Sequence, residues 1–231
     1  MKLFIDTESI PTQQPGALEE IRKSIQPPGN MSKAETIAKW MMENADSAAE
    51  EKWRKTALDG TKGELVVIGF ATDDDPIVST HYRDLDMSEG DLIQNAFDEM
   101  AEKNSVAIAT RGDYLNPQFI GHNIIGFDIR FLFQRAVILG IKPPFQLPTD
   151  QRYNSDKVFD CMLAWAGWGN YISLDALCAA LGIPCQSNGV DGSMVWDLVK
   201  AGRIGDVVTH CMEDVESVRR VYRRMTFQEV A

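Results

Sequence analysis

The chain has 231 residues, of which 44% are hydrophobic, enough for one substantial core or two small ones. Its net charge of −11 excludes a non-specific nucleic-acid coat protein, but not an enzyme that neutralises its acids with bound cations. No apolar stretch approaches the roughly 20 residues of a membrane span, and acidic residues interrupt the opening MKLFIDTES too early for a secretory signal. The four cysteines form no CxxC pair, which is typical of buried thiols. We therefore expect a cytoplasmic protein without membrane association.

The first half of the chain alternates strands with one long insertion. The apolar run at residues 2–6 predicts a buried strand, and residues 64–72 and 77–82 predict the two strands of a hairpin. Residues 11–62 between them are polar and helix-forming. We expect this insertion to be helical and packed on one edge of the domain, where a structural lid is favoured over a surface that holds substrate or a partner.

The second half is predicted to be mainly helical. Helices are expected at 88–102 and 127–140, and strands at 105–110 and 118–123. Further helices are expected at about 160–167, 173–181, 193–201 and 205–226. No internal repeat or linker divides the chain. We therefore predict one domain, residues 1–231, of the α/β class, with a mixed sheet flanked by helices and a helical insertion after the first strand.

Four acidic residues stand where a fold could gather them. Asp6 and Glu8 lie two apart at the end of the first predicted strand, so they share a face. Asp128 falls in the first turn of a predicted helix, and Asp214 lies one turn after His210 on the last helix. Paired acids at a strand end often only cap turns or face solvent. Carboxylates on a core strand are costly to bury unless cations neutralise them, which favours a metal site.

This set of residue types is suited to the hydrolysis of a phosphodiester. Two divalent cations roughly 3.5–4 Å apart can activate a water and stabilise the leaving oxygen. Carboxylate oxygens are the ligands that Mg²⁺ and Mn²⁺ prefer. His210, with a reference pKa near 6.5, could deprotonate or orient the water.

The order of these motifs also resembles a known family. DTE, then HNIIGFD, then a helical H/Y-x-x-x-D resemble the three motifs of the DnaQ-like, or DEDD, 3′–5′ exonucleases. Within them, SLDALCAALGIP and DGSMVWDLVKAGRIGDVVTHCMEDV are similar to the group related to the proofreading domain of family B DNA polymerases. The resemblance covers roughly residues 1–10 and 64–227. It implies an RNase H-like fold, two Mg²⁺ or Mn²⁺ ions and a single-stranded 3′ end as substrate.

The resemblance assigns roles by position and leaves one departure. The metal-binding and catalytic acids would be Asp6, Glu8, Asp128 and Asp214, and the residues in contact with substrate would be Thr7, Asn123 and Phe127. His210 stands where that group usually has tyrosine, while the histidine branch of the superfamily has one more residue before its aspartate. Either His210 acts as the base from the tyrosine position or the site is weakened. The first is favoured because tyrosine, with a pKa near 10, can only orient water.

These observations lead to one expected function and two alternatives. We expect a metal-dependent 3′–5′ exonuclease acting on single-stranded DNA, with a replication or repair protein as a possible partner because no polymerase domain accompanies it. An RNA-trimming exonuclease of the same fold is the first alternative, since sugar discrimination rests on contacts around the 2′ position. The second is a nucleic-acid-binding adaptor with a weakened site, which only the departure at His210 supports.

Several other residues could contact substrate but are first interpreted as structural. Asp160 fits the N-terminus of a helix, His81 an exposed strand position, and His122 a support for the second motif. For the tryptophans at 165, 168 and 196 we expect core packing in preference to stacking on bases. Four arginines near the end of the last helix are equally consistent with phosphate contact and with a solvated helix end: Arg219, Arg220, Arg223 and Arg224.

Overall fold

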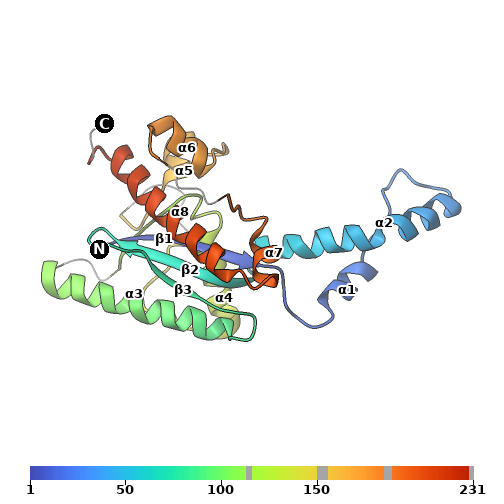
Figure 1. The fold of residues 1–231 in the computed structure, drawn as a ribbon, viewed down its shortest axis with the longest axis horizontal. Coiled ribbons are helices and arrows are strands. Elements are labelled where there is room, and N and C mark those ends of the chain that lie inside the picture. The colour runs from blue at the N-terminus through green and yellow to red at the C-terminus, as the bar shows by residue number, and fades with distance from the viewer. Residues whose placement is uncertain (113–115, 150–155, 185–188, 229–231) are drawn as a thin grey trace.

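A computed structural model describes residues 1–112, 116–149, 156–184 and 189–228. Its centre is a five-stranded sheet in the order β3-β2-β1-β4-β5, with helices on both faces (Figure 1). Strand β1 pairs antiparallel with β2 and parallel with β4, and β4 pairs parallel with β5. The strands are β1 (Lys2–Ile10), β2 (Glu64–Thr72), β3 (Ser79–Tyr82), β4 (Gln118–Gly121) and β5 (Val158–Asp160). This mixed sheet is the α/β architecture predicted from the sequence.

The alternation of side chains along β1 determines which helix each residue meets. Leu3 and Ile5 belong to the core shared with helices α3 (Glu89–Arg111) and α4 (Asp128–Leu139). Phe4 points to the other face, where its ring centroid lies 5.6 Å from that of Tyr222 on α8 (Ile204–Met225). Since successive strand residues alternate between faces, the even-numbered residues of β1 face α8 and the odd-numbered ones face α4.

The helices of the second half begin and end close to the predicted positions. They are α5 (Cys161–Ala166), α6 (Leu174–Leu181), α7 (Val195–Lys200) and the long α8. The Ser173 hydroxyl accepts the Ala176 amide at 3.2 Å and caps α6. Helices α4 and α6 end where Gly140 and Gly182 take the left-handed conformation, with φ of 70° and 66°.

Two strand assignments made from the sequence need correction. The strand predicted at 105–110 is wrong, because α3 continues through it to Gly112. Neither glycine nor proline interrupts this stretch, and the hydroxyls of Ser105 and Thr110 donate to carbonyls one turn earlier, at 2.8 and 2.7 Å. Conversely, β5 was not predicted, since three residues before a helix are too few to show a strand pattern.

The insertion is helical as predicted but differs in its placement. It comprises α1 (Ala17–Lys23), α2 (Ala34–Arg54) and a 3₁₀ turn at Lys55–Leu58, and it projects from the domain instead of packing along an edge (Figure 1). Its base is attached to α7. The rings of Trp53 and Trp196 meet edge to face at 5.2 Å, and Arg54 donates two hydrogen bonds to Asp197, at 3.0 and 2.8 Å. No helix in the described parts of the chain is both long and apolar enough to cross a bilayer.

Candidate active site

The predicted acids meet where β1, α4 and α8 converge. Asp6 and Glu8 are on the face of β1 that α8 covers, and His210 and Asp214 are on α8. The Nε2 atom of His210 lies 3.5 Å from Glu8 Oε1 and 3.9 Å from Asp214 Oδ2. Residues about 200 positions apart in sequence therefore share one site, with an imidazole between two carboxylates.

A glycine allows α8 to approach the sheet this closely. Gly69 on β2 is paired with Asp6 on β1. A Cβ atom at Gly69 would lie 2.7 Å from the Cys211 Sγ atom, which is too close for a real contact. The Cys211 thiol donates to the Asp6 carbonyl oxygen at 3.5 Å. The helix turn that carries His210 and Asp214 is therefore seated directly on the strand that carries the other two acids.

Asp128 is oriented from β1 by Thr7. Its Oδ1 atom accepts the Thr7 amide at 3.0 Å and the Thr7 hydroxyl at 2.8 Å. The Asp128 residue is only 4% exposed, so these two bonds fix one carboxylate oxygen in a buried position. This orienting contact was not predicted from the sequence. The substrate contact expected of Thr7 stays a prediction.

The four carboxyl groups are electrostatically frustrated. Burial raises the pKa of Asp6 and Glu8 well above the ordinary value, and repulsion from the other acids of the site raises it further. Burial also raises the pKa of Asp128, to about 7, and that of Asp214, which His210 partly offsets. The Oδ2 atom of Asp6 is buried and has no hydrogen-bond partner among the described residues. Buried acids of this kind are stabilised when cations neutralise them.

The donors fit divalent cations in type, although the side chains are not closed around one. Among the described residues, no three His, Cys, Asp or Glu side chains form a group that could hold a metal ion as they stand. Carboxylate oxygens are nevertheless the donors that Mg²⁺ and Mn²⁺ prefer, and Asp6 Oδ2 is free to take up a cation. A bound ion would relieve the repulsion that raises the pKa of Asp6 and Glu8.

A fifth acid, Asp160, holds the loop that leads to Asp128. It is fully buried, and its carboxylate accepts the amides of Asn123, Ile125 and Leu163, at 3.1, 3.2 and 3.2 Å. The predicted role at a helix N-terminus is confirmed, because Asp160 caps α5. Its bonds to the 123–125 backbone were not predicted. An acid that follows a short apolar run and precedes a helix was the available signal.

The remaining residues of the second motif lie in this loop. His122 Nε2 is 2.8 Å from the Ile172 carbonyl oxygen, and burial lowers its pKa, so the neutral ring supports the loop as predicted. Asn123 adopts a left-handed backbone with φ of 59°. Phe127, just before α4, packs on Phe131 with ring centroids 5.3 Å apart. The nucleotide contacts expected of Asn123 and Phe127 stay predictions.

Comparison with protein families agrees with this geometry. A family described as a predicted 3′–5′ exonuclease related to the exonuclease domain of PolB matches residues 65–230. The chain belongs to this family. The matched segment includes Asp128, His210 and Asp214 but begins after β1. Asp6 and Glu8 therefore lie outside the matched segment, and it is the fold that brings them next to it.

A solved structure supports the fold assignment. The family B DNA polymerase from the hyperthermophilic archaeon Pyrobaculum calidifontis is similar, with a TM-score of 0.50 and 13% sequence identity. The similarity covers 73% of this chain and 22% of the polymerase chain, so this chain spans about a fifth of the polymerase. The likeness shows the fold, an RNase H-like mixed sheet with flanking helices. A search of curated proteins found no match.

Within this exonuclease-family domain, two predictions about aromatic residues are wrong. His81 is not exposed, because its Nε2 atom lies 2.8 Å from Glu99 Oε2 and its ring stacks on Phe70 at 5.8 Å. Trp165 and Trp168 do not pack in the core, since they are 47% and 66% exposed. Trp196 is partly buried against Trp53, as expected.

The arginines near the end of α8 support the structural interpretation. The Arg219 and Arg223 guanidinium groups donate to the carbonyl oxygens of Asp75 and Asp73, at 2.9 and 3.3 Å. Arg220 donates to Glu216 on the same helix at 3.2 Å. Arg219 and Arg223 hold the β2–β3 turn to α8. The cysteines at 161, 178 and 211 are buried, whereas Cys185 lies outside the described residues.

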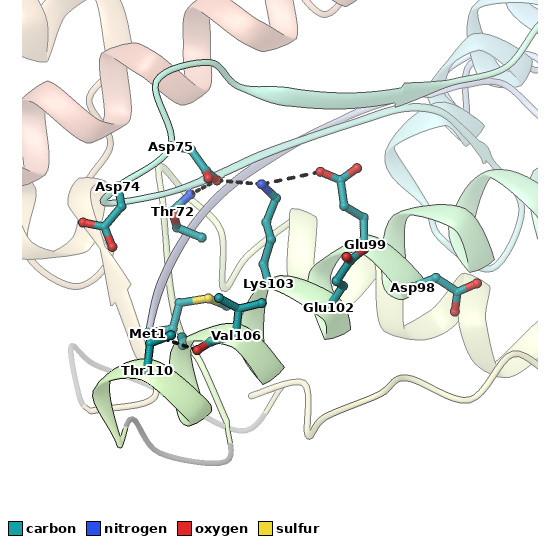
Figure 2. Close-up of a pocket in the computed structure, with 11 residues that line it drawn as sticks. Met1, Thr72, Asp74, Asp75, Asp98, Glu99, Glu102, Lys103, Val106 and Thr110 are labelled. Carbon is teal, nitrogen blue, oxygen red and sulfur yellow. Dashed lines mark hydrogen bonds and ion pairs between the residues drawn. The ribbon is translucent and has the colours of Figure 1, made fainter.

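A groove of about 730 Å³ lies near the other end of β1, between α3 and the start of the strand (Figure 2). Its lining includes five carboxylates, among them Asp75 and Glu99, which pair with Lys103 at 3.0 and 3.6 Å. Thr72 on its wall is paired with Leu3, at the opposite end of β1 from Glu8. None of the candidate active-site residues lines this groove, so it is separate from that site.

The raised pKa values predict how stability depends on pH without metal. A carboxyl with a raised pKa stabilises the folded state when protonated, and this stabilisation is lost as the pH rises through its folded pKa, about 7 for Asp128. Burial lowers the pKa of His122, so this residue adds stability as the pH rises, but only up to its reference pKa near 6.5. We therefore expect the Tm of EDTA-treated protein to fall as the pH rises from about 6.5 through 7, and Mg²⁺ to reverse the fall.

Differential scanning fluorimetry at matched ionic strength measures this dependence. A control in which Mg²⁺ is replaced by an equal ionic strength of NaCl separates binding from screening. A flat Tm over this pH range, unaffected by Mg²⁺, would contradict the electrostatic description of the site.

Proposed function

We propose that the chain is a metal-dependent 3′–5′ exonuclease that removes nucleotides from the 3′ end of single-stranded DNA. The observation that carries this proposal is a cluster of four buried or partly buried carboxylates, two of them within 4 Å of His210, in a chain of the exonuclease family. Two Mg²⁺ or Mn²⁺ ions would be held by the acids at positions 6, 8, 128 and 214. When bound, such ions polarise the phosphodiester and acidify water.

The proposed role of His210 follows from its surroundings. Its Nε2 atom accepts the proton of the attacking water as the water oxygen bonds to phosphorus. The bond from phosphorus to the 3′ oxygen of the preceding nucleotide breaks, and that oxygen takes up a proton from solvent. A nucleoside 5′-monophosphate and a strand shortened by one nucleotide are the products. Glu8 and Asp214, within 4 Å of the imidazole, would orient it toward the water. This arrangement favours a working base over a weakened site.

The proposal extends to the setting in which the protein acts. Cys161 and Cys211 are buried free thiols, which is consistent with the cytoplasm, where thiols stay reduced. Two bound divalent ions would change the formal charge from −11 to −7, which reduces repulsion of the nucleic-acid strand. A replication or repair protein is the partner that we propose.

An oligonucleotide assay tests the activity directly. A 20-nucleotide DNA labelled at its 5′ end is incubated with the protein and Mg²⁺ or Mn²⁺, beside an RNA of matched sequence. We expect a ladder that shortens by one nucleotide at a time, faster on DNA than on RNA, and no ladder in EDTA. Faster RNA trimming would favour the exoribonuclease alternative. Absence of cleavage with either metal on either strand would support a binding adaptor and defeat the proposal.

Replacing Thr7 with valine tests the support of Asp128. The substitution keeps the shape and the amide bond but removes the hydroxyl that donates to Asp128 Oδ1 at 2.8 Å. Loss of such an orienting contact typically costs about 10–100-fold in metal affinity or activity. We expect the Mg²⁺ concentration for half-maximal cleavage to rise within that range. Thr209→Val, which removes an exposed helix hydroxyl on α8, should leave it unchanged. Equal Mg²⁺ dependence in all three proteins would remove Thr7 from the site.

A further inference from the structure

Three large aromatic side chains are exposed close together in sequence. Trp165, Trp168 and Tyr171 are 47%, 66% and 77% exposed. Trp53, by contrast, is 9% exposed, and Trp196 is partly buried against it. Exposed aromatic surface of this extent is unfavourable in water, and its concentration within seven residues is typical of a surface that something covers.

The segment that carries these rings, residues 161–173, borders the candidate active site at both of its ends. At the start, the Asp160 carboxylate binds the amides of Asn123 and Leu163, so it joins α5 to the loop before Asp128. At the end, the Ile172 carbonyl oxygen lies 2.8 Å from His122 Nε2 in the same loop. Both ends of the aromatic segment are therefore hydrogen-bonded to the loop of the second motif.

The electrostatics of the acids place the segment in the same position. Burial is the main cause of the raised pKa of Asp128, and the neighbouring charge of Asp160 adds to it. Burial is likewise the main cause for Asp214, and the charge of Asp175 adds to it. Asp160 and Asp175, which flank the segment, are thus close enough to Asp128 and Asp214 to interact with them electrostatically.

The turn that presents the rings is held by hydrogen bonds. The Gly167 amide donates to the Leu163 carbonyl at 3.0 Å, and the Asn170 side-chain amide donates to the Ala166 carbonyl at 3.0 Å. Gly167 and Gly169 take φ of 79° and 80°, a conformation that side chains disfavour. The chain is therefore shaped at this turn to bring the tryptophans and the tyrosine to the surface.

We propose that Trp165, Trp168 and Tyr171 form a stacking platform for the bases of single-stranded nucleic acid, next to its 3′-terminal nucleotide. This inference rests on the proposed function and explains how the candidate active site would hold the strand. Residues 161–173 carry no charge, in a chain of which 25% is charged. Such a surface suits the faces of bases, which stack on aromatic rings regardless of sequence, better than the phosphate backbone. Stacking also supplies affinity that a protein of net charge −11 does not obtain from phosphate contacts.

Fluorescence anisotropy with a 12-nucleotide DNA labelled at its 5′ end measures the platform. The measurements are made with Mg²⁺ in a His210→Ala background, so that binding is observed with little cleavage. Trp165→Ala, Trp168→Ala and Tyr171→Ala are each expected to raise Kd by about 5- to 150-fold. Trp168→Phe keeps an aromatic face and should bind nearly as the parent does. Tyr82→Ala, which removes an exposed ring from the edge strand at the other side of the sheet, is the matched control and should leave Kd unchanged.

An abasic oligomer and a minimal substrate make the test decisive. A 12-nucleotide strand with abasic sites behind the 3′ end should bind the parent as weakly as the ordinary strand binds Trp168→Ala. Unchanged Kd in the three alanine variants, or full affinity for the abasic strand, would overturn the platform. The p-nitrophenyl ester of thymidine 5′-monophosphate has no second base, so Trp168→Ala with His210 intact should cleave it at the wild-type rate. If the wild-type protein cleaves neither this ester nor any oligomer, the proposed function fails, while the anisotropy still decides the platform.

Discussion

Replacing Asp6 with asparagine is expected to reduce 3′–5′ exonuclease turnover by at least about 10²-fold and to raise the Tm of the metal-free protein. The loss follows because a metal ion contributes several kcal/mol to transition-state stabilisation, and each 1.36 kcal/mol is a factor of ten in rate. The gain in stability follows because Asp6 is a repelled, buried acid with one unpartnered oxygen. Single-turnover cleavage of a labelled oligomer and thermal unfolding in EDTA measure the two effects.

The opposite directions of these effects separate a metal ligand from a structural carboxylate. Asp98→Asn, on the exposed face of α3, is the control and should change neither quantity. A variant that lost activity together with stability would indicate that Asp6 holds the fold. A variant with wild-type turnover would exclude Asp6 from the reaction.

Replacing His210 with alanine is expected to lower turnover at pH 7 by about 10²–10⁴-fold, the usual contribution of a general base. Its imidazole lies 3.5 Å from Glu8 and 3.9 Å from Asp214, where no other described histidine reaches. His210→Tyr introduces the residue usual in related exonucleases and should retain intermediate turnover, since a phenol can orient water but is a poor proton acceptor near neutral pH.

The pH profile distinguishes proton transfer from simple packing. The shape of the pH–rate profile should differ between the wild-type protein and both substituted proteins, because proton transfer to His210 is lost in them. His81→Ala, which removes a histidine paired with Glu99 at a distant strand, is the control. Wild-type turnover in His210→Ala would show that the residue at this position is not the base.

Much of the fold follows from patterns within single elements. Strand β2 contains the apolar run LVVIGFA and is flanked by glycine and aspartates, so its bounds were predicted correctly at 64–72. The helix at 174–181 has a serine cap and a glycine end. The stretch 105–110 has the β-branched residues of a strand, but it continues a helix with no break, and tertiary packing of that helix decides its state.

The acids of the candidate site could be predicted from the sequence, but the hydrogen bonds that hold them in place could not. Asp6, Glu8, Asp128 and Asp214 appear in motifs whose spacing is visible in one dimension. The bonds from Thr7 to Asp128 and from Asp160 to Asn123 join residues 121 and 37 positions apart, so only the fold brings them together. The direction of the α1–α2 insertion depends on long-range contacts, such as those of Trp53 and Arg54 with α7, which no local pattern encodes.

The most direct test of the central claim is the number of divalent ions that the four acids hold. Isothermal titration with Mn²⁺, with the bound ions counted by electron paramagnetic resonance, should give two ions per wild-type chain and the loss of at least one in Asp6→Asn and in Asp214→Asn. Asp98→Asn should bind as the wild type does. Absence of Mn²⁺ binding to the wild-type protein, or equal binding by all four proteins, would contradict a two-metal site at Asp6, Glu8, Asp128 and Asp214.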